Sequence, residues 1–109
     1  MDAEKLKILR NSASEKSILI VEDSKIIQNQ IYTFLKKFFK NVYQAFDGEE
    51  GISQYTKYHQ DIVLTDLTMP KMNGLEMIKK IKFINKNVKI IILSAHNEEE
   101  VLLDAIKLN

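Results

Sequence analysis

The sequence predicts a doubly wound α/β domain, in which helices cover both faces of a parallel sheet. Three observations support this fold class: short runs rich in β-branched residues recur along the chain, segments with helical periodicity separate them, and the runs are apolar without alternation. Such continuous runs are typical of strands buried on both faces. Because strands and helices alternate, the connections are right-handed crossovers and the sheet is parallel. The 109 residues suffice for one domain of this kind.

Four strands are expected, near residues 17–22, 41–45, 61–66 and 88–94. The first, third and fourth contain the apolar runs ILIV, IVL and VKIIIL, whereas the second contains the less apolar VYQA. Runs of this length with β-branched residues indicate strands rather than helices.

A helix is expected after each strand. The first begins after Ser24, the second opens at the acidic N-cap Asp47 with Glu50 three residues on, and the last opens at Asn97. Apolar residues at helical spacing mark the buried faces of these helices. The expected stripes are Ile27, Ile31, Phe34, Leu35 and Phe38 in the first helix, Leu75, Ile78 and Ile81 in the third, and Val101, Leu102, Ala105 and Ile106 in the fourth.

Composition limits the partners and the location of the protein. The formal net charge is +1, from 16 basic and 15 acidic residues, so charge predicts no nucleic-acid and no membrane partner. The absence of cysteine excludes disulfides, thiolate metal sites and cysteine nucleophiles. No apolar run approaches the roughly 20 residues that span a bilayer, and the first residues lack the apolar block of a signal peptide. We therefore expect a cytoplasmic protein.

Polar side chains follow three of the expected strands. Glu22 and Asp23 end the first strand, Asp66 ends the third, and Ser94 ends the fourth. Taken singly, each has a simpler explanation as a turn residue, an acidic first turn of a helix or a loop hydroxyl. Together they would meet at the carboxyl edge of the sheet, where doubly wound folds bind ligands. Carboxylates in one place repel each other, and a hard divalent cation such as Mg²⁺ resolves that repulsion.

Three stretches carry a resemblance to a known family: ILIVEDS, DIVLTDLTMPKMNG and VKIIILSA. They resemble the first strand, the phosphoacceptor strand with its loop, and the fourth strand of the receiver domains of two-component response regulators. The resemblance runs from about Ser17 to Asn109. It implies a flavodoxin-like receiver fold with the strand order 2-1-3-4.

The resemblance also implies a function for the residues at the carboxyl edge. The domain would accept a phosphoryl group from a sensor histidine kinase or a histidine phosphotransfer protein, with Mg²⁺ or Mn²⁺ bound, and then switch conformation. It would not be an enzyme beyond phosphorylating and dephosphorylating itself. The implied site residues are Asp66 as phosphoryl acceptor, Glu22, Asp23 and Asp66 as metal ligands, the backbone carbonyl of Thr68 as a further ligand, Ser94 as the switch hydroxyl, and Thr68 and His96 as modulators.

The sequence departs from the family at its end. Receivers continue with a fifth strand that bears a lysine and with a fifth helix, whereas this sequence ends at Asn109, at the end of the fourth expected helix. None of the lysines Lys82, Lys86, Lys89 and Lys107 is expected at the tip of a strand beside the acids. We therefore expect an N-terminal extension and linker over residues 1–16 and a C-terminally truncated receiver over residues 17–109. An exposed fourth strand and first helix would favour self-association.

Two other classes of function remain open from the residues alone. The first is a pseudo-receiver or oligomerising module without a phosphoryl cycle. The second is a Mg²⁺-dependent phosphohydrolase with an aspartyl nucleophile. Thr68 argues against this hydrolase class, since it stands where such enzymes have a second acid.

Overall fold

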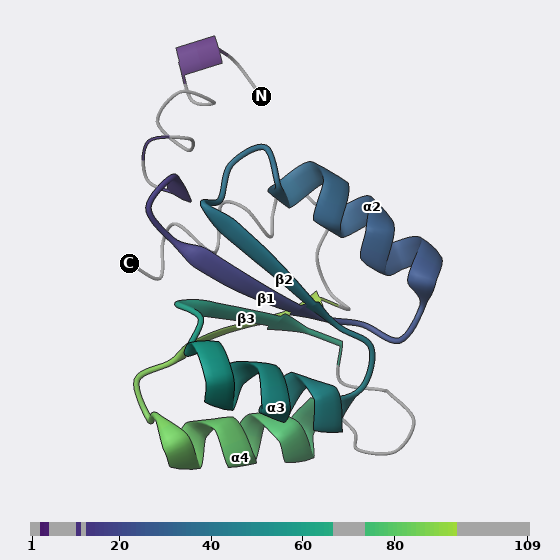
Figure 1. The fold of residues 1–109 in the computed structure, drawn as a ribbon, viewed down its shortest axis with the longest axis vertical. Coiled ribbons are helices and arrows are strands. Elements are labelled where there is room, and N and C mark those ends of the chain that lie inside the picture. The colour runs from purple at the N-terminus through teal and green to yellow at the C-terminus, as the bar shows by residue number, and fades with distance from the viewer. Residues whose placement is uncertain (1–2, 5–10, 12, 67–73, 94–109) are drawn as a thin grey trace.

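The computed structural model describes residues 3–4, 11, 13–66 and 74–93 (Figure 1). Strands and helices alternate along these residues as the sequence predicts. In chain order the elements are β1 (Ser17–Val21), α2 (Lys25–Leu35), β2 (Asn41–Ala45), α3 (Gly48–Tyr58), β3 (Ile62–Thr65), α4 (Gly74–Ile84) and β4 (Lys89–Ile92). The fourth helix expected after Ser94 falls outside the described residues.

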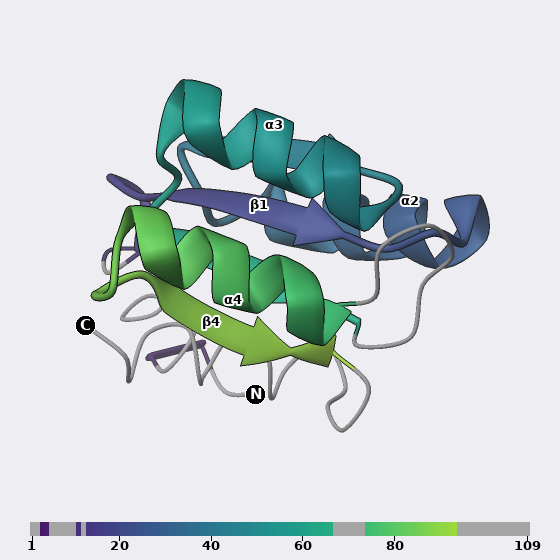
Figure 2. The ribbon, with the colours of Figure 1, turned by 90° about the horizontal axis from the view of Figure 1, so that it is seen from below.

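The strands form one parallel sheet in the order β2-β1-β3-β4, which confirms the predicted doubly wound fold. β1 is central and pairs with β2 from Ser17↔Asn41 to Val21↔Ala45, and with β3 from Ile18↔Ile62 to Val21↔Thr65. Helix α2 covers one face, and α3 and α4 lie together on the other (Figures 1 and 2). None of the described helices is long and apolar enough to span a membrane.

Two apolar cores lie on opposite faces of this sheet, and alternate residues of β1 contribute to each. Ile18 and Ile20 pack on the α2 side with Leu35, and Leu19 and Val21 pack on the side of α3 and α4. These four side chains of β1 are fully buried. A strand covered on both faces needs apolar residues at every position, which explains the unbroken ILIV run.

The helix starts predicted at Ser24 and Asp47 are both capped in the structure, whereas Asn97 lies outside the described residues. The Ser24 hydroxyl accepts the backbone N–H of Ile27 at 3.3 Å, and the Asp47 carboxylate accepts that of Glu50 at 2.8 Å. These side chains satisfy N–H groups that have no partner within the first turn of a helix.

The expected stripe of α2 is correct for part of the helix and wrong at its start. Ile31 and Leu35 are buried, but Ile27 is 43% exposed and Gln28 is fully buried beside them. The helix also ends at Leu35, so the buried Phe38 belongs to the turn that follows it. The buried face of α2 therefore includes Gln28 rather than Ile27. The physical reason is that the Gln28 amide donates hydrogen bonds to backbone carbonyls in the core.

The expected stripe of α4 requires a similar correction. Leu75 is 54% exposed and Ile78 only partly buried, whereas Met77 and Ile81 are fully buried against α3 and the sheet. Gly51 of α3 permits this arrangement, since a Cβ atom there would lie 2.6 Å from the Met77 sulfur. The close approach of the two helices therefore depends on a position without a side chain.

Hydrogen bonds at the amino edge of the sheet join β1 to the start of β3. The Asp61 carboxylate accepts the backbone N–H of Ser17 at 2.9 Å and its hydroxyl at 3.2 Å, while the Ser17 hydroxyl accepts the Asp61 N–H. Ala13 lies within residues 1–16, the expected N-terminal extension and linker, yet it is fully buried in the α2-side core. The domain boundary at residue 17 stays a prediction.

Candidate functional site

The register of the sheet brings Asp66 next to the acidic pair that ends β1. Val21 and Thr65 are the last paired residues of the two strands, and the Asp66 N–H donates to the Val21 carbonyl at 3.2 Å. On the other side of β1, the Glu22 N–H donates to the Ala45 carbonyl at 3.1 Å. Backbone hydrogen bonds thus continue one residue beyond the strands and hold the acids at one edge.

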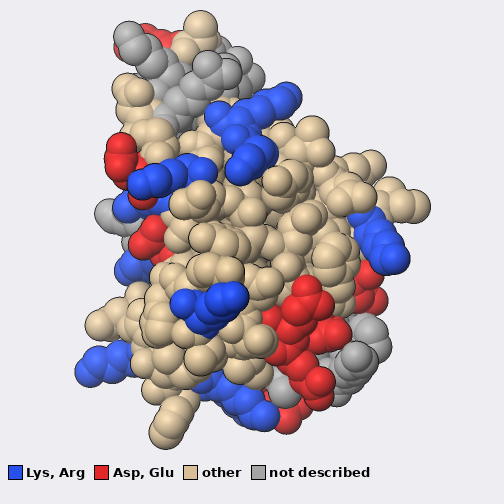
Figure 3. All heavy atoms as spheres, viewed as in Figure 1, with Lys and Arg blue, Asp and Glu red and all other residues tan. Residues whose placement is uncertain are grey.

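The side chains of Glu22, Asp23 and Asp66 converge at this edge. Each offers a carboxylate oxygen, and these oxygens all lie within 4.8 Å of one another. Glu22 is only 3% exposed, Asp66 is half-buried and Asp23 is exposed. Acidic side chains gather on the side of the molecule where α3 and α4 begin (Figure 3). The three acids that the sequence analysis selected are therefore neighbours in space.

Burial of Glu22 has an electrostatic consequence. The pKa of this carboxyl is raised from 4.5, mainly because burial penalises its charged form. A side-chain hydrogen bond with Asp23 and the nearby charges of Asp66 and Asp23 raise the pKa further, while the Ser24 backbone N–H opposes the shift. That N–H donates to the Glu22 carboxylate at 3.3 Å. A bound cation would favour the charged form of this buried acid and of the two acids beside it.

The donor set fits a hard divalent cation. Within the described residues the donors are three carboxylates, and oxygen ligands of this kind suit Mg²⁺ or Mn²⁺ better than softer metals. Asp23 is exposed, which leaves room for waters that Mg²⁺ usually retains. Such an ion would offset both the mutual repulsion of the acids and the burial of Glu22.

Sequence reasoning missed Gln28, whose side chain is buried beside the acidic pair. Its amide nitrogen lies 2.9 Å from the Ala45 carbonyl oxygen, 3.1 Å from that of Ile20 and 3.3 Å from that of Glu22. One signal in the sequence could have found it. Gln28 precedes Ile31 by three residues and Leu35 by seven, so it lies on the buried face of α2.

The remaining predicted site residues are not placed. Thr68, Ser94 and His96 lie outside the described residues, so their roles stay predictions.

The side chain of Lys82 is placed, and its ammonium group donates to the Val88 carbonyl, just before β4 begins. This lysine therefore lies near the amino end of β4, away from the acids, as the sequence analysis expected.

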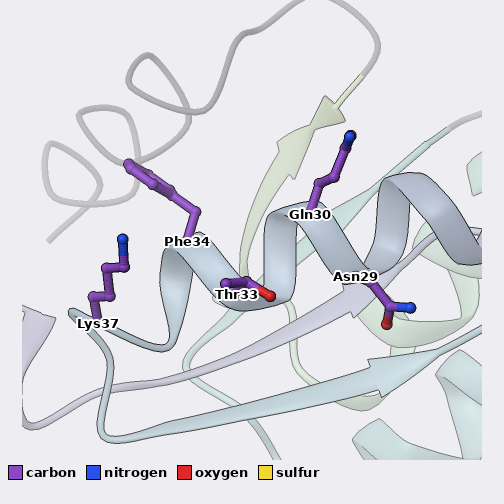
Figure 4. Close-up of a pocket in the computed structure, with 5 residues that line it drawn as sticks. All are labelled: Asn29, Gln30, Thr33, Phe34 and Lys37. Atoms are coloured by element: carbon purple, nitrogen blue, oxygen red, sulfur yellow. The ribbon is translucent and has the colours of Figure 1, made fainter.

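A separate hollow of about 570 Å³ lies over α2 (Figure 4). Among the described residues, its lining comes from this helix and the turn after it, namely Asn29, Gln30, Thr33, Phe34 and Lys37. The hollow is widely open, and none of the described residues that line it is an acid.

A family model and the sequences of known proteins point to the same family. A family model described as the response regulator receiver domain matches residues 18–109. The chemotaxis protein CheY of Thermotoga maritima is 36% identical over 93 residues, which cover 84% of this chain and 78% of that protein.

Solved structures are similar in fold as well as in sequence. The N-terminal domain of an uncharacterized protein from Wolinella succinogenes has a TM-score of 0.69 at 36% identity, with 89% of this chain and 77% of that chain covered. A complex of CheX and CheY with BeF3 and Mg²⁺ from Borrelia burgdorferi has a TM-score of 0.70 at 30% identity, with 91% of this chain and 76% of that chain covered.

Proposed function

This chain belongs to the response regulator receiver domain family, and on that premise we propose that Asp66 accepts a phosphoryl group during two-component signalling. Members of this family are signalling proteins rather than metabolic enzymes. The observation that carries the proposal is the convergence of Glu22, Asp23 and Asp66, whose carboxylate oxygens lie within 4.8 Å of one another. Three acids gathered at the carboxyl edge of a parallel sheet suit the binding of a cation and of a phosphoryl group.

Receiver domains bind Mg²⁺ through an acidic cluster, and the same three residues are the ones that would hold it here. When bound, the ion would neutralise charge on the carboxylates and on an incoming phosphoryl group. Asp23 is the exposed member and the most accessible ligand, and Glu22 is the buried one. The similarity to the Borrelia burgdorferi CheY solved with Mg²⁺ supports this assignment.

The chemical step uses the Asp66 carboxylate as the nucleophile. One of its oxygens forms a bond to phosphorus while the bond between phosphorus and the nitrogen of a phosphohistidine donor breaks. The electron pair of that bond stays on the nitrogen, which takes up a proton. Backbone pairing of Asp66 with Val21 holds the acceptor in place, since the peptide on its amino side is part of the sheet ladder. A sensor histidine kinase or a histidine phosphotransfer protein is the proposed donor.

Phosphorylation would change the charge and hydrogen bonding of the site. A phosphoryl group adds up to about two negative charges and three acceptor oxygens. The Ser94 hydroxyl, predicted at the end of the fourth strand, is the group that we propose bonds to them, with Thr68 and His96 as modulators. The conformational switch follows from this new set of hydrogen bonds.

Acetyl phosphate, a small phosphodonor, provides a direct test of the proposal. With Mg²⁺ present, the wild type should gain the mass of one phosphoryl group and Asp66→Asn should gain none. Asp61→Asn is the matched control, because Asp61 precedes the same strand at its opposite end. It should label like the wild type. Equal labelling of wild type and Asp66→Asn would overturn the assignment.

The same experiment separates the two other classes of function. A pseudo-receiver would fold and yet acquire no phosphoryl group at any donor concentration. A phosphohydrolase would release phosphate over many turnovers, whereas a receiver is labelled once per molecule and loses the group slowly.

We also propose that the chain associates with a second copy of itself. Ile26 and Ile27 at the start of α2 are 74% and 43% exposed. No described strand pairs with the outer side of β4, and an apolar edge strand is a template for pairing. Sedimentation at micromolar concentration should show a dimer or larger species, and a compact monomer would contradict this proposal.

A further inference from the structure

Gln28 occupies a position that connects three segments of the site. Its amide nitrogen contacts carbonyls of β1 at Ile20, of the acidic pair at Glu22, and of the end of β2 at Ala45. An amide group has two N–H donors, so the three carbonyls share them. Only the nitrogen end of the amide can face three carbonyl oxygens, so these contacts fix its orientation.

The contacts enclose the peptide groups on both sides of Glu22. The Glu22 N–H donates to the Ala45 carbonyl, which also accepts from Gln28, and the Glu22 carbonyl accepts from Gln28 itself. The backbone of Glu22 is thus held at its donor and at its acceptor. Its side chain, together with that of Asp23, is then presented from a backbone that cannot shift without breaking these bonds.

We propose that Gln28 is a positioning residue that holds the acidic pair in the geometry for a divalent cation and so sets the affinity for Mg²⁺. The inference rests on the proposed function, because it assigns a support to the same metal site. Without the ion, Glu22, Asp23 and Asp66 repel each other, and a free backbone would let them move apart. The Gln28 hydrogen bonds oppose that relaxation before the ion arrives.

Gln28 makes these hydrogen bonds at a cost to the stability of the fold. Gln28 is fully buried, and its side-chain oxygen has no hydrogen-bond partner within the described part of the chain. A buried polar atom without a partner destabilises the fold. An apolar residue of similar length, such as methionine, would avoid that penalty, but it would leave the Glu22 carbonyl without its donor.

The test compares Gln28→Met with Gln60→Met as a matched control. Gln60 is also a buried glutamine, 1% exposed, but it precedes β3 at the opposite end of the sheet, and neither of its side-chain polar atoms has a hydrogen-bond partner among the described residues. Two quantities are measured for each protein: the Mg²⁺ dissociation constant by calorimetry, and the urea midpoint of unfolding in EDTA. We expect Gln28→Met to bind Mg²⁺ about tenfold more weakly or worse, as for other residues that support metal ligands. Gln60→Met should bind it like the wild type.

The two readouts separate positioning from stability. A residue with a structural role alone would move the unfolding midpoint and leave the Mg²⁺ affinity of the folded protein unchanged, and that result would overturn the inference. A second measurement needs no variant: the Gln28 side-chain amide resonances of the wild type should shift during a Mg²⁺ titration, while those of Gln60 stay in place. If both sets stay in place, the inference is also wrong.

Mg²⁺ binding by the wild type shows whether a failed test concerns the role of Gln28 or the proposed function itself. If the wild type binds Mg²⁺ and Gln28→Met binds it equally well, only the role of Gln28 is wrong. If the wild type binds no Mg²⁺, the metal site of the proposed function is wrong, and the inference falls with it.

Discussion

The backbone N–H of Asp66 donates a hydrogen bond to the carbonyl of Val21 at 3.2 Å, one residue beyond the last paired residues of β3 and β1. Val21 is followed directly by Glu22 and Asp23. The bond therefore sets the distance between the proposed phosphoacceptor and the proposed metal ligands through the sheet register rather than through a flexible loop. A shift of one residue in that register would turn the Asp66 side chain to the other face.

Mg²⁺ should stabilise the folded protein, because the cation binds a site that exists only after folding. The gain follows the ratio of Mg²⁺ concentration to the dissociation constant and reaches about 2.7 kcal/mol at a hundredfold excess over that constant. Asp23→Ala should lose this gain while folding normally, since Asp23 is exposed. Glu49→Ala, another exposed acid in the first turn of α3, is the control and should keep it. Thermal unfolding with and without EDTA measures the effect, and a full Mg²⁺ response in Asp23→Ala would contradict the assignment.

The raised pKa of Glu22 predicts a pH dependence of stability in the absence of metal. A carboxyl whose pKa is higher in the folded than in the unfolded protein stabilises the fold at pH values below its unfolded pKa. That contribution is lost as pH rises through its folded pKa. The sign is the reverse of that for a carboxylate in a salt bridge. Glu22→Gln should remove this loss, so in EDTA the variant gains stability relative to wild type as pH rises above the ordinary glutamate pKa of about 4.3.

Glu22→Gln should also gain less stability from Mg²⁺ than the wild type gains. Glu22→Gln removes one carboxylate from the site, so Mg²⁺ should stabilise it less than it stabilises the wild type. Urea unfolding at several pH values, with and without Mg²⁺, measures both effects. A wild type and variant with parallel pH profiles in EDTA would show that Glu22 carries no such charge penalty.

Gly51→Ala should destabilise the domain. The new methyl group would lie 2.6 Å from the Met77 sulfur and 3.2 Å from a Val21 methyl, and both of these side chains are fully buried. Overpacking of this kind costs about 1–3 kcal/mol, which outweighs the gain in helix propensity of up to about 1 kcal/mol. Chemical denaturation measures the loss. In a Met77→Ala background the same change should cost less, and an equal cost in both backgrounds would rule out the steric explanation.

Much of the fold could be predicted because local features determine it. The unbroken ILIV run indicated a strand buried on both faces, and Ser24 and Asp47 each cap a helix where the sequence placed one. The acids of the site could be selected for a similar reason, since the carboxyl ends of parallel strands meet at one edge of the sheet.

Other features depend on groups that the local sequence does not specify. Ile27 was expected in the core, yet Gln28 is there instead because three backbone carbonyls from β1, from the residue after it and from β2 receive its amide. The Ser17 and Asp61 pair joins positions 44 residues apart. Leu75 was expected to be buried, but the contact between α4 and α3 at Gly51 turns Met77 inward. Each of these follows from packing between distant segments, which periodicity alone does not reveal.

The central claim, that Asp66 carries the phosphoryl group, is tested most directly by locating the modified residue. The protein is incubated with acetyl phosphate and Mg²⁺, the acyl phosphate is reduced with borohydride, and peptides are sequenced by mass spectrometry. The account predicts conversion to homoserine at residue 66 alone, and loss of that product when EDTA replaces Mg²⁺. Conversion at residue 23 or residue 61, or no conversion in the folded wild type with Mg²⁺ present, would contradict it.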